Sequence, residues 1–211
     1  MGIDVVLATG NPHKRQELLA LLGDVGYRIR TMDEFSSLPE IIEDGETCEA
    51  NAIKKATILA RHTGLLALAD DTGLEVDALN GRPGVYAARY AGEQATYEDN
   101  CQKLLQELDG IPREKRTARF RTVMALVEPS LQIEVVEGIL EGLIVETSRG
   151  TQGFGYDPVF WVPNLDCTLA ELTVEQKNRI SHRAQALEKA KTILNKKRET
   201  HHIVTGRSAA R

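Results

Sequence analysis

Apolar residues along the chain recur at two different spacings, which predict strands and helices. Residues 3–8 and 65–69 form short, largely apolar runs that are too short for helices and favour buried strands. Apolar residues spaced three and four apart predict three helices. The first lies between Asn11 and Gly23, the second between Thr47 and Gly64, and the third between Thr96 and Gly110. Pro12 supports the first of these helices, because the first helical position needs no N–H donor.

The second half of the chain predicts strands followed by a helix. Residues 117–127 and 131–145 are rich in β-branched residues and are separated by Glu128-Pro129-Ser130, which is typical of a long antiparallel hairpin. Residues 158–162 predict a further strand, and residues 173–197 have helical spacing. Because strands alternate with helices early and a hairpin follows, the predicted class is α/β with a mixed sheet.

The chain has 211 residues, 42% of them hydrophobic, which is enough to bury a core without disulfides. Its net charge of −5 argues against binding to DNA or RNA polymers, because these need a basic face. No apolar run exceeds five residues, so we expect no membrane span and no secretion signal. Three widely spaced cysteines suit a reducing compartment, and the cytoplasm is the expected location. The polar segment 197–211 is expected to be a disordered tail.

The segment from Thr9 to Lys14 is the first candidate site. A predicted strand runs into Gly10 and a helix begins within three residues. Free backbone N–H groups and the positive end of the helix dipole can therefore bind an anion here. Lys14, in the first turn, can reach back to a phosphate, although the spacing is not that of a Walker A loop. A helix that is merely capped by Asn11 is the alternative interpretation.

Asp70 and Asp71 form the second candidate site. They follow an apolar run, so we expect them at the carboxyl end of a strand, where α/β proteins place ligands. Buried carboxylates at such a place commonly hold a cation such as Mg²⁺. Neighbouring side chains on a strand point in opposite directions, so one of the two is expected to face the cleft and the other to be structural. A solvated acidic turn is the alternative interpretation of this pair. In the predicted helix between Thr47 and Gly64, Lys55 is expected from the pattern alone to face solvent.

Two further segments carry candidate ligands. The glycine-rich loop 150–158 can present backbone groups and the face of its phenylalanine, although a bulged strand with core aromatics is the alternative. Lys177, His182 and Arg183 would lie at about 0°, 140° and 240° around one continuous helix and could not converge on one ligand. They can converge only if the helix breaks at Ser181 and this serine caps a second helix. An unbroken helix with a solvated basic face is the alternative.

Seven motifs follow one another in register along the chain. They are L-A-T-G-N-x-x-K at 7–14, E-x-G-x-T at 43–47, N-A-x-x-K-A at 51–56, A-D-D-T-G-L at 69–74, G-R-P-G-V-Y-A-A-R-Y at 81–90, G-F-G-Y-D-P-V-F at 153–160 and S-H-R at 181–183. In this order they resemble the inosine triphosphate pyrophosphatase (Ham1-like) family over about residues 3 to 194. The chain departs from the family's pattern at Ala50, where the expected Glu would support a helix cap, and at Ala87, where Ser is usual.

The resemblance implies an α/β fold with a long mixed sheet and flanking helices. Residues 1–196 would form a single domain of two lobes around a central active-site cleft, usually as a homodimer. The implied reaction is hydrolysis of purine nucleoside triphosphates with deaminated bases (ITP, dITP and XTP) between the α and β phosphates, giving a monophosphate and pyrophosphate.

The resemblance also implies the residues that carry this reaction. Asp71 would be the catalytic residue, and Glu43 and Asp71 would bind the cofactor Mg²⁺. The implied substrate-binding residues are Thr9, Gly10, Asn11, Pro12, His13, Lys14, Lys55, Thr72, Phe154, Gly155, Tyr156, Asp157, Lys177, His182 and Arg183. Among them, His13 is expected to lie at the surface.

Two other functions stay open on the sequence. A Maf-like pyrophosphatase acting on pyrimidine or methylated nucleotides would share the fold and the cation chemistry, although the S-H-R and G-F-G-Y-D segments argue against it. A nucleotide-binding regulator without turnover would share the pocket, although the presence of every acidic candidate favours an enzyme. Comparing ITP with UTP and dTTP separates the first rival, and pyrophosphate release separates the second.

Overall fold

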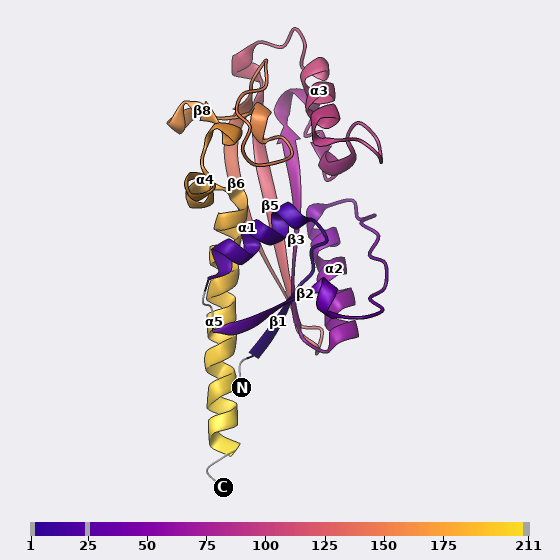
Figure 1. Cartoon of the computed structure of the whole chain (residues 1–211), viewed down its shortest axis with the longest axis vertical. Coiled ribbons are helices and arrows are strands. Elements are labelled where there is room, and N and C mark those ends of the chain that lie inside the picture. Colours follow the sequence, from indigo (N-terminus) through magenta and orange to yellow (C-terminus); the bar gives the residue numbers. More distant parts are fainter. Residues whose placement is uncertain (1–2, 24–25, 209–211) are drawn as a thin grey trace.

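A computed structural model describes residues 3–23 and 26–208, with side chains up to residue 200. Within these residues eight strands form one mixed sheet, which confirms the predicted α/β class (Figure 1). The strands are β1 (Ile3–Leu7), β2 (Tyr27–Thr31), β3 (Leu66–Val76), β4 (Pro83–Gly84), β5 (Thr117–Val127), β6 (Ile133–Ile144), β7 (Phe160–Val162) and β8 (Cys167–Thr168). The α-helices of the described residues are α1 (Pro12–Leu22), α2 (Cys48–Thr63), α3 (Tyr97–Glu107), α4 (Val174–Ile180) and α5 (His182–Ser208).

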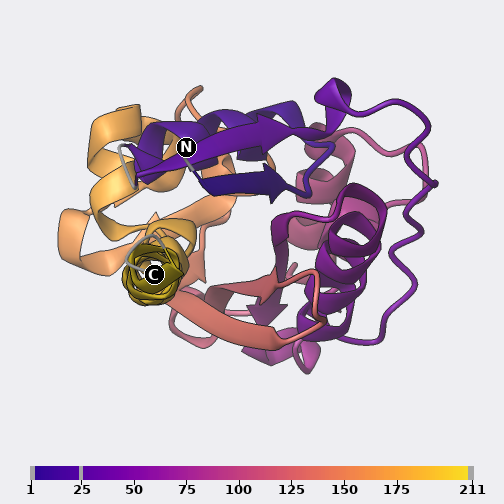
Figure 2. The same cartoon turned by 90° about the horizontal axis from the view of Figure 1, so that it is seen from below.

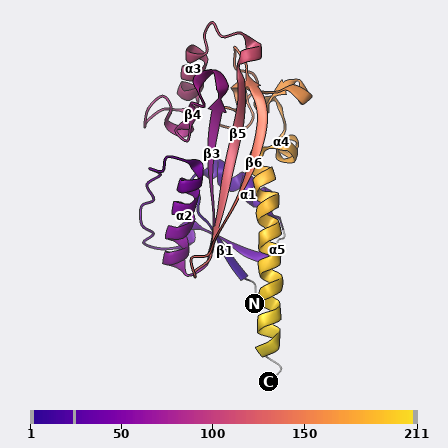
Figure 3. The same cartoon turned by 180° about the vertical axis from the view of Figure 1, so that it is seen from behind.

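The sheet has a parallel part and an antiparallel part. Its strand order is β2-β1-β3-β5-β6-β7-β8, and β4 pairs with β3. Strand β1 runs parallel to both β2 and β3, whereas the pairs from β3 to β8 are antiparallel. The predicted hairpin is confirmed as β5 and β6. Together with β3, these two long strands run side by side along the molecule (Figure 3).

Alternate side chains of β5 face two different layers. Val123 and Ala125 pack with α2, whereas Met124 and Leu126 pack with α5. Seen from below, α2 and α5 accordingly lie on opposite sides of the hairpin (Figure 2). The two-residue period of an extended strand therefore fixes the position of both helices relative to the sheet.

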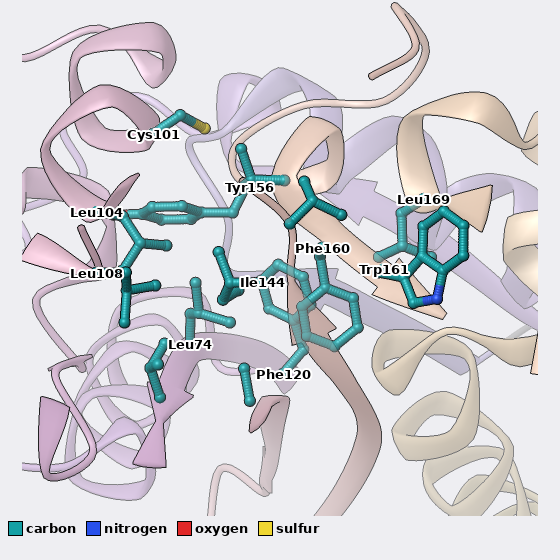
Figure 4. Packing of buried hydrophobic residues seen from close by; sticks show 14 of the residues in the cluster. Leu74, Cys101, Leu104, Leu108, Phe120, Ile144, Tyr156, Phe160, Trp161 and Leu169 are labelled. Carbon is teal, nitrogen blue, oxygen red and sulfur yellow. The ribbon is translucent and has the colours of Figure 1, made fainter. Parts of the chain in front are cut away.

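A third hydrophobic cluster extends the core beyond these two helices (Figure 4). Leu104 of α3 packs there with Leu74 of β3, and the rings of Phe120 and Phe160 lie 4.6 Å apart. Tyr156 belongs to the same cluster and donates a hydrogen bond from its hydroxyl to the carbonyl oxygen of Ala87 at 2.8 Å. This packing anchors the glycine-rich loop, which the sequence alone left without a position.

The predicted starts of α1 and α2 are confirmed. The side chain of Asn11 accepts hydrogen bonds from the backbone N–H groups of His13 and Lys14, at 3.0 and 3.2 Å. The Thr47 hydroxyl accepts from the backbone N–H of Ala50 at 3.1 Å, so this helix keeps its cap although alanine stands where a glutamate is usual. No helix in the described part of the chain is long and apolar enough to cross a membrane.

The structure corrects the predicted position of the aspartate pair. Asp70 and Asp71 lie in the middle of β3 rather than at its carboxyl end, because the strand continues to Val76. Leu74 and Val76 are fully buried, and the whole extension stays paired with β5. Burial of this second half explains why polar residues at 70–72 do not end the strand. Strand β2, whose alternating basic residues gave no signal, was missed altogether.

Two boundaries near the end of the chain also differ from the prediction. The strand predicted from Pro158 begins at Phe160, because Asp157–Val159 forms a 3-10 turn. Helix α5 continues to Ser208, so the segment expected to be disordered from residue 197 is helical over 197–208. Lys197 is held there by Glu128 and, at 2.6 Å, by Glu134. Residues 209–211 of that predicted tail lie outside the described residues.

Gly138 of β6 supports the first turn of α5, and we expect a side chain there to destabilise the protein. A Cβ atom at this position would lie 2.0 Å from the carbonyl oxygen of His182 and 2.6 Å from the backbone nitrogen of Ala186. Because both neighbours are backbone atoms, Gly138→Ala should lower the free energy of unfolding in urea by about 2 kcal/mol or more. Gly10→Ala is the control, since no heavy atom lies within 4 Å of its added Cβ. Equal stabilities of the two variants would contradict this close approach.

Candidate active site

The break between α4 and α5 brings three predicted side chains together. Ser181 has an extended backbone, with φ −63° and ψ 150°, and its hydroxyl accepts from the backbone N–H of Ala184 at 3.1 Å. The predicted break and the second cap are therefore confirmed. Lys177 at the end of one helix and His182 and Arg183 at the start of the next all line one pocket.

This pocket contains most of the residues that the sequence singled out. Those that line it are Thr9, Gly10, Asn11, Lys14, Glu43, Lys55, Asp71, Thr72, Phe154, Gly155, Tyr156, Asp157, Lys177, His182 and Arg183. Pro12 and His13 do not line it; His13 is exposed, as expected, but its ring stacks on Phe154 at 5.2 Å. The remaining lining residues were not among the predicted site residues, although all except Tyr97 and Phe120 stand in the motifs; they are Gly73, Val85, Ala87, Ala88, Arg89, Tyr97 and Phe120.

One wall of the pocket is a cluster of charges around Glu17. The Lys177 ammonium contacts Glu17 at 2.9 Å and Asp157 at 2.6 Å, and Arg183 donates to the other oxygen of Glu17. Both cations also lie over the ring of Phe154, at 4.8 and 5.6 Å from its centre. Glu17 is a residue that sequence reasoning missed, because its helical position gives no sign of contacts more than 150 residues away.

The two aspartates of β3 have different surroundings, as the alternation of a strand predicted. Asp70 is 1% exposed and does not line the pocket; it contacts Lys14 at 3.2 Å and Arg183 at 3.4 Å. Burial disfavours its charge, but Lys14, Arg183 and Lys55 outweigh that effect and hold the pKa of Asp70 well below its usual range. Its role in the described structure is to pair the cations of α1 and α5.

Asp71 faces the pocket together with Glu43. One oxygen of Asp71 accepts from the side-chain amide of Asn51 at 3.1 Å, and the other lies 3.7 Å from the Lys55 ammonium. Lys55 also contacts Glu43 at 3.1 Å, so one buried cation joins the two carboxylates. Burial raises the pKa of Asp71 although Lys55 and Lys14 oppose the change. The prediction from the pattern alone that Lys55 faces solvent is wrong, since this lysine is 5% exposed.

Asn51 links this carboxylate to the loop before α2. Its side-chain oxygen accepts from the backbone N–H of Gly45 at 2.7 Å, while its amide nitrogen donates to Asp71. The loop that carries Glu43 is thereby tied to the strand that carries Asp71. Asn51 was part of a motif in the sequence, but its bonding partners could not be read from it.

The site can bind an extended anion that ends in a flat ring. The lining includes the cationic side chains of Lys14, Lys55, Lys177 and Arg183 and the ring of Phe154, which lies beneath the Lys177 and Arg183 cations and beside His13 of the first turn of α1. The Glu43 and Asp71 carboxylates add acceptors for a divalent cation or for a proton. Within the described residues, no group of three or more His, Cys, Asp or Glu side chains is placed to hold a metal ion by itself.

Fold and pocket together define an α/β protein with a site for an anionic ligand. The chain belongs to the Ham1 family, because the family's sequence model matches residues 5–193. A protein named dITP/XTP pyrophosphatase from Desulforamulus reducens is 53% identical over 192 residues, which cover 91% of this chain and 96% of that protein. A protein of the same name from Bacillus subtilis is 48% identical over 191 residues, 90% of this chain and 96% of its own length.

A solved structure is similar as well. The HAM1 protein from Coxiella burnetii superposes with a TM-score of 0.85 at 44% identity, covering 92% of this chain and 99% of that one. The residues that the family's sequence model matches include every lining residue of the pocket.

The buried His182 should make the stability of the protein depend on pH. Burial, together with the charges of Arg183 and Lys177, lowers the pKa of His182 well below its usual range. Below about pH 6.5 the unfolded chain binds a proton at this position and the folded protein does not, so stability falls as the pH falls. From pH 7 to 5.5 this term should remove about 1 kcal/mol from the free energy of unfolding.

The measurement is a set of urea titrations at several pH values. His182→Gln lacks the term, so its stability should approach that of the unmodified protein as the pH drops. The exposed His62, changed to Gln, controls for the substitution itself. Parallel pH profiles for the unmodified protein and His182→Gln would show that His182 is not held neutral.

Proposed function

We propose that this chain is a dITP/XTP pyrophosphatase, which hydrolyses ITP, dITP and XTP between the α and β phosphates to a monophosphate and pyrophosphate. The names of relatives that are about half identical over nine tenths of the chain support this activity. The single observation that carries the proposal is that one pocket is lined by the Asp71 and Glu43 carboxylates, by Lys14, and by Phe154, His182 and Arg183.

The donor set of the pocket fits Mg²⁺. Mg²⁺ is usually bound by one or two carboxylates, with substrate phosphates and water completing its six ligands. Glu43 and Asp71 supply such a pair, since both already balance the charge of one ammonium group, that of Lys55. When bound, the ion would draw negative charge from the phosphates.

Asp71 is the group that we assign to the attacking water. Its carboxylate faces the pocket, is held by Asn51, and has a raised pKa, so it accepts a proton more readily than an exposed aspartate. Lys14 and the positive end of the α1 dipole would hold the phosphates, assisted by Thr9, Gly10 and Asn11. Lys55 would hold Glu43 and Asp71 in place while the charge on the phosphates changes.

The part of the pocket around Phe154 is assigned to the base and sugar. Phe154 would stack on the base, and Lys177 and Arg183 keep their positions through Glu17 and Asp157. Thr72, Gly155, Tyr156 and His182 complete the enclosure. We further propose that the chain forms two lobes with this cleft between them, that it acts in the cytoplasm where nucleotide pools lie, and that it assembles as a homodimer.

A panel of nucleoside triphosphates with pyrophosphate detection tests the proposal. We expect ITP, dITP and XTP to release pyrophosphate in the presence of Mg²⁺, with a kcat/KM at least about tenfold above that of ATP, because a site built for a ring carbonyl leaves an amino group without a partner. Preference for UTP or dTTP would favour a Maf-like enzyme instead. Binding without release of pyrophosphate would identify a regulator.

The two aspartates of β3 should differ when each is changed to Asn. Asp71→Asn should lower turnover at saturating Mg²⁺ by about 10²-fold or more, since a proton acceptor is lost. Its stability should be equal or higher, because a buried carboxylate with a raised pKa is removed. Asp70→Asn should instead lower the free energy of unfolding by about 3 kcal/mol, because Lys14 and Arg183 lose a buried counter-charge.

Turnover and urea unfolding of both variants make this comparison. Retention of more than about a tenth of normal turnover by Asp71→Asn would exclude its catalytic role. A larger direct loss of turnover in Asp70→Asn, with its stability intact, would mean that the other carboxylate is the catalytic one.

A further inference from the structure

A chain of three hydrogen bonds runs behind the pocket and ends on His182. Thr72 and Thr122 are directly opposite each other on β3 and β5, and their hydroxyl oxygens lie 2.7 Å apart. The Thr122 hydroxyl is in turn 2.6 Å from Nδ1 of His182. Thr122 is completely buried and does not line the pocket. Thr122 lies outside the seven sequence motifs, and the proposed function gives it no role.

The direction of this chain follows from its first member. Nη2 of Arg183 lies 3.3 Å from the Thr72 hydroxyl, and a guanidinium can only donate. If Thr72 accepts this bond and donates to Thr122, and Thr122 donates to His182, both hydroxyl protons point away from the guanidinium. In the opposite direction the protons of Nδ1 and of Thr122 point toward this cation, and the Thr72 hydroxyl, which is half-buried and lines the pocket, donates into the pocket. The charge of Arg183 therefore favours the direction from Arg183 to His182.

This direction decides which nitrogen of His182 carries the proton. An Nδ1 atom that accepts from Thr122 leaves the proton of a neutral ring on Nε2. The ring is kept neutral by burial and by the neighbouring cations, which lower its pKa. Phe120 stacks on it at 4.7 Å and 22°, which fixes its plane. Within the described structure Nε2 has no protein partner, and the ring forms part of the pocket wall.

We propose that Thr122 is a positioning residue for substrate choice, which holds His182 with its proton on Nε2 and thereby makes the pocket present a hydrogen-bond donor. A purine with a carbonyl at its 6-position can accept this bond, whereas an amino group at the same position would leave two donors facing each other. The inference rests on the proposed function for its substrate, but the tautomer itself is a property of the protein without ligand.

The tautomer is measured directly by nitrogen-15 NMR of the histidine rings in the unmodified full chain. We expect His182 to show a protonated Nε2 and an unprotonated Nδ1 near neutral pH. The His182 signals are assigned as those absent from His182→Gln. A ring protonated on Nδ1, or on both nitrogens, overturns the inference whatever the activity of the protein.

The kinetic test compares Thr122→Val with Thr122→Ser. Valine keeps the volume and removes the hydroxyl, so the ratio of kcat/KM for ITP to that for ATP should fall about tenfold, which corresponds to about 1.4 kcal/mol. Serine keeps the hydroxyl and should restore the ratio to within about twofold. In Thr122→Val the NMR signals should also show a mixture of both tautomers.

The outcomes separate this inference from the proposed function. If the unmodified protein does not release pyrophosphate from ITP, the proposed function fails, and the NMR result still tests the tautomer. If the unmodified protein prefers ITP but Thr122→Val keeps both the ratio and the Nε2–H tautomer, the inference fails alone. A fall in thermal stability of Thr122→Val with an unchanged ITP-to-ATP ratio would also overturn it, because a merely structural hydroxyl would behave in that way.

Discussion

A carboxylate buried in the middle of the sheet needs cations, and the positions of α1 and α5 meet this need. Asp70 is surrounded by protein, and an ion in such surroundings is costly unless opposite charges contact it. Lys14 from α1 and Arg183 from α5 supply those charges. The start of each helix is thereby fixed beside the same residue of β3. The pocket lies where these two helix starts meet, so its shape depends on this one buried ion cluster.

Two consecutive residues of β3 have different roles, one structural and the other assigned to catalysis. Asp70 points into the ion cluster, and Asp71 points into the pocket, where Asn51 and Lys55 hold it. A displacement of β3 that weakened the contacts of Asp70 would also move Asp71 away from Asn51 and Lys55. We infer that positional precision at the candidate catalytic carboxylate derives from the charges on the other face of its own strand.

Local signals allowed much of the architecture to be predicted. Caps and glycines marked the ends of α1 and α2, and the geometry of a helix required the break at Ser181, which the structure confirms. Contacts between distant segments were not predictable in this way. Strand β2 has few apolar residues and is stabilised by its pairing with β1, and the extension of β3 beyond Asp71 depends on β5.

In the candidate site, too, residues with local signals were predicted and residues that depend on distant contacts were not. Residues in motifs were found because their local setting, at a helix start or beside a glycine, suggested a ligand. Glu17 and Thr122 were missed because each acts through a partner far away in the sequence. The buried position of Lys55 was missed for the same reason, since only the folded chain brings Asp71 of β3 and Glu43 of the loop before α2 to it.

The pairing of every major cation in the pocket has a consequence for how a ligand arrives. Lys14, Lys55, Lys177 and Arg183 each already contact at least one carboxylate. Little unbalanced positive field is then left to extend into solvent, and the whole chain is acidic. A charged ligand is therefore not drawn in from a distance, and its association rate should vary little with ionic strength. Specific binding begins only after contact, when the ligand and any cation bound to it replace ion pairs that these side chains form within the protein.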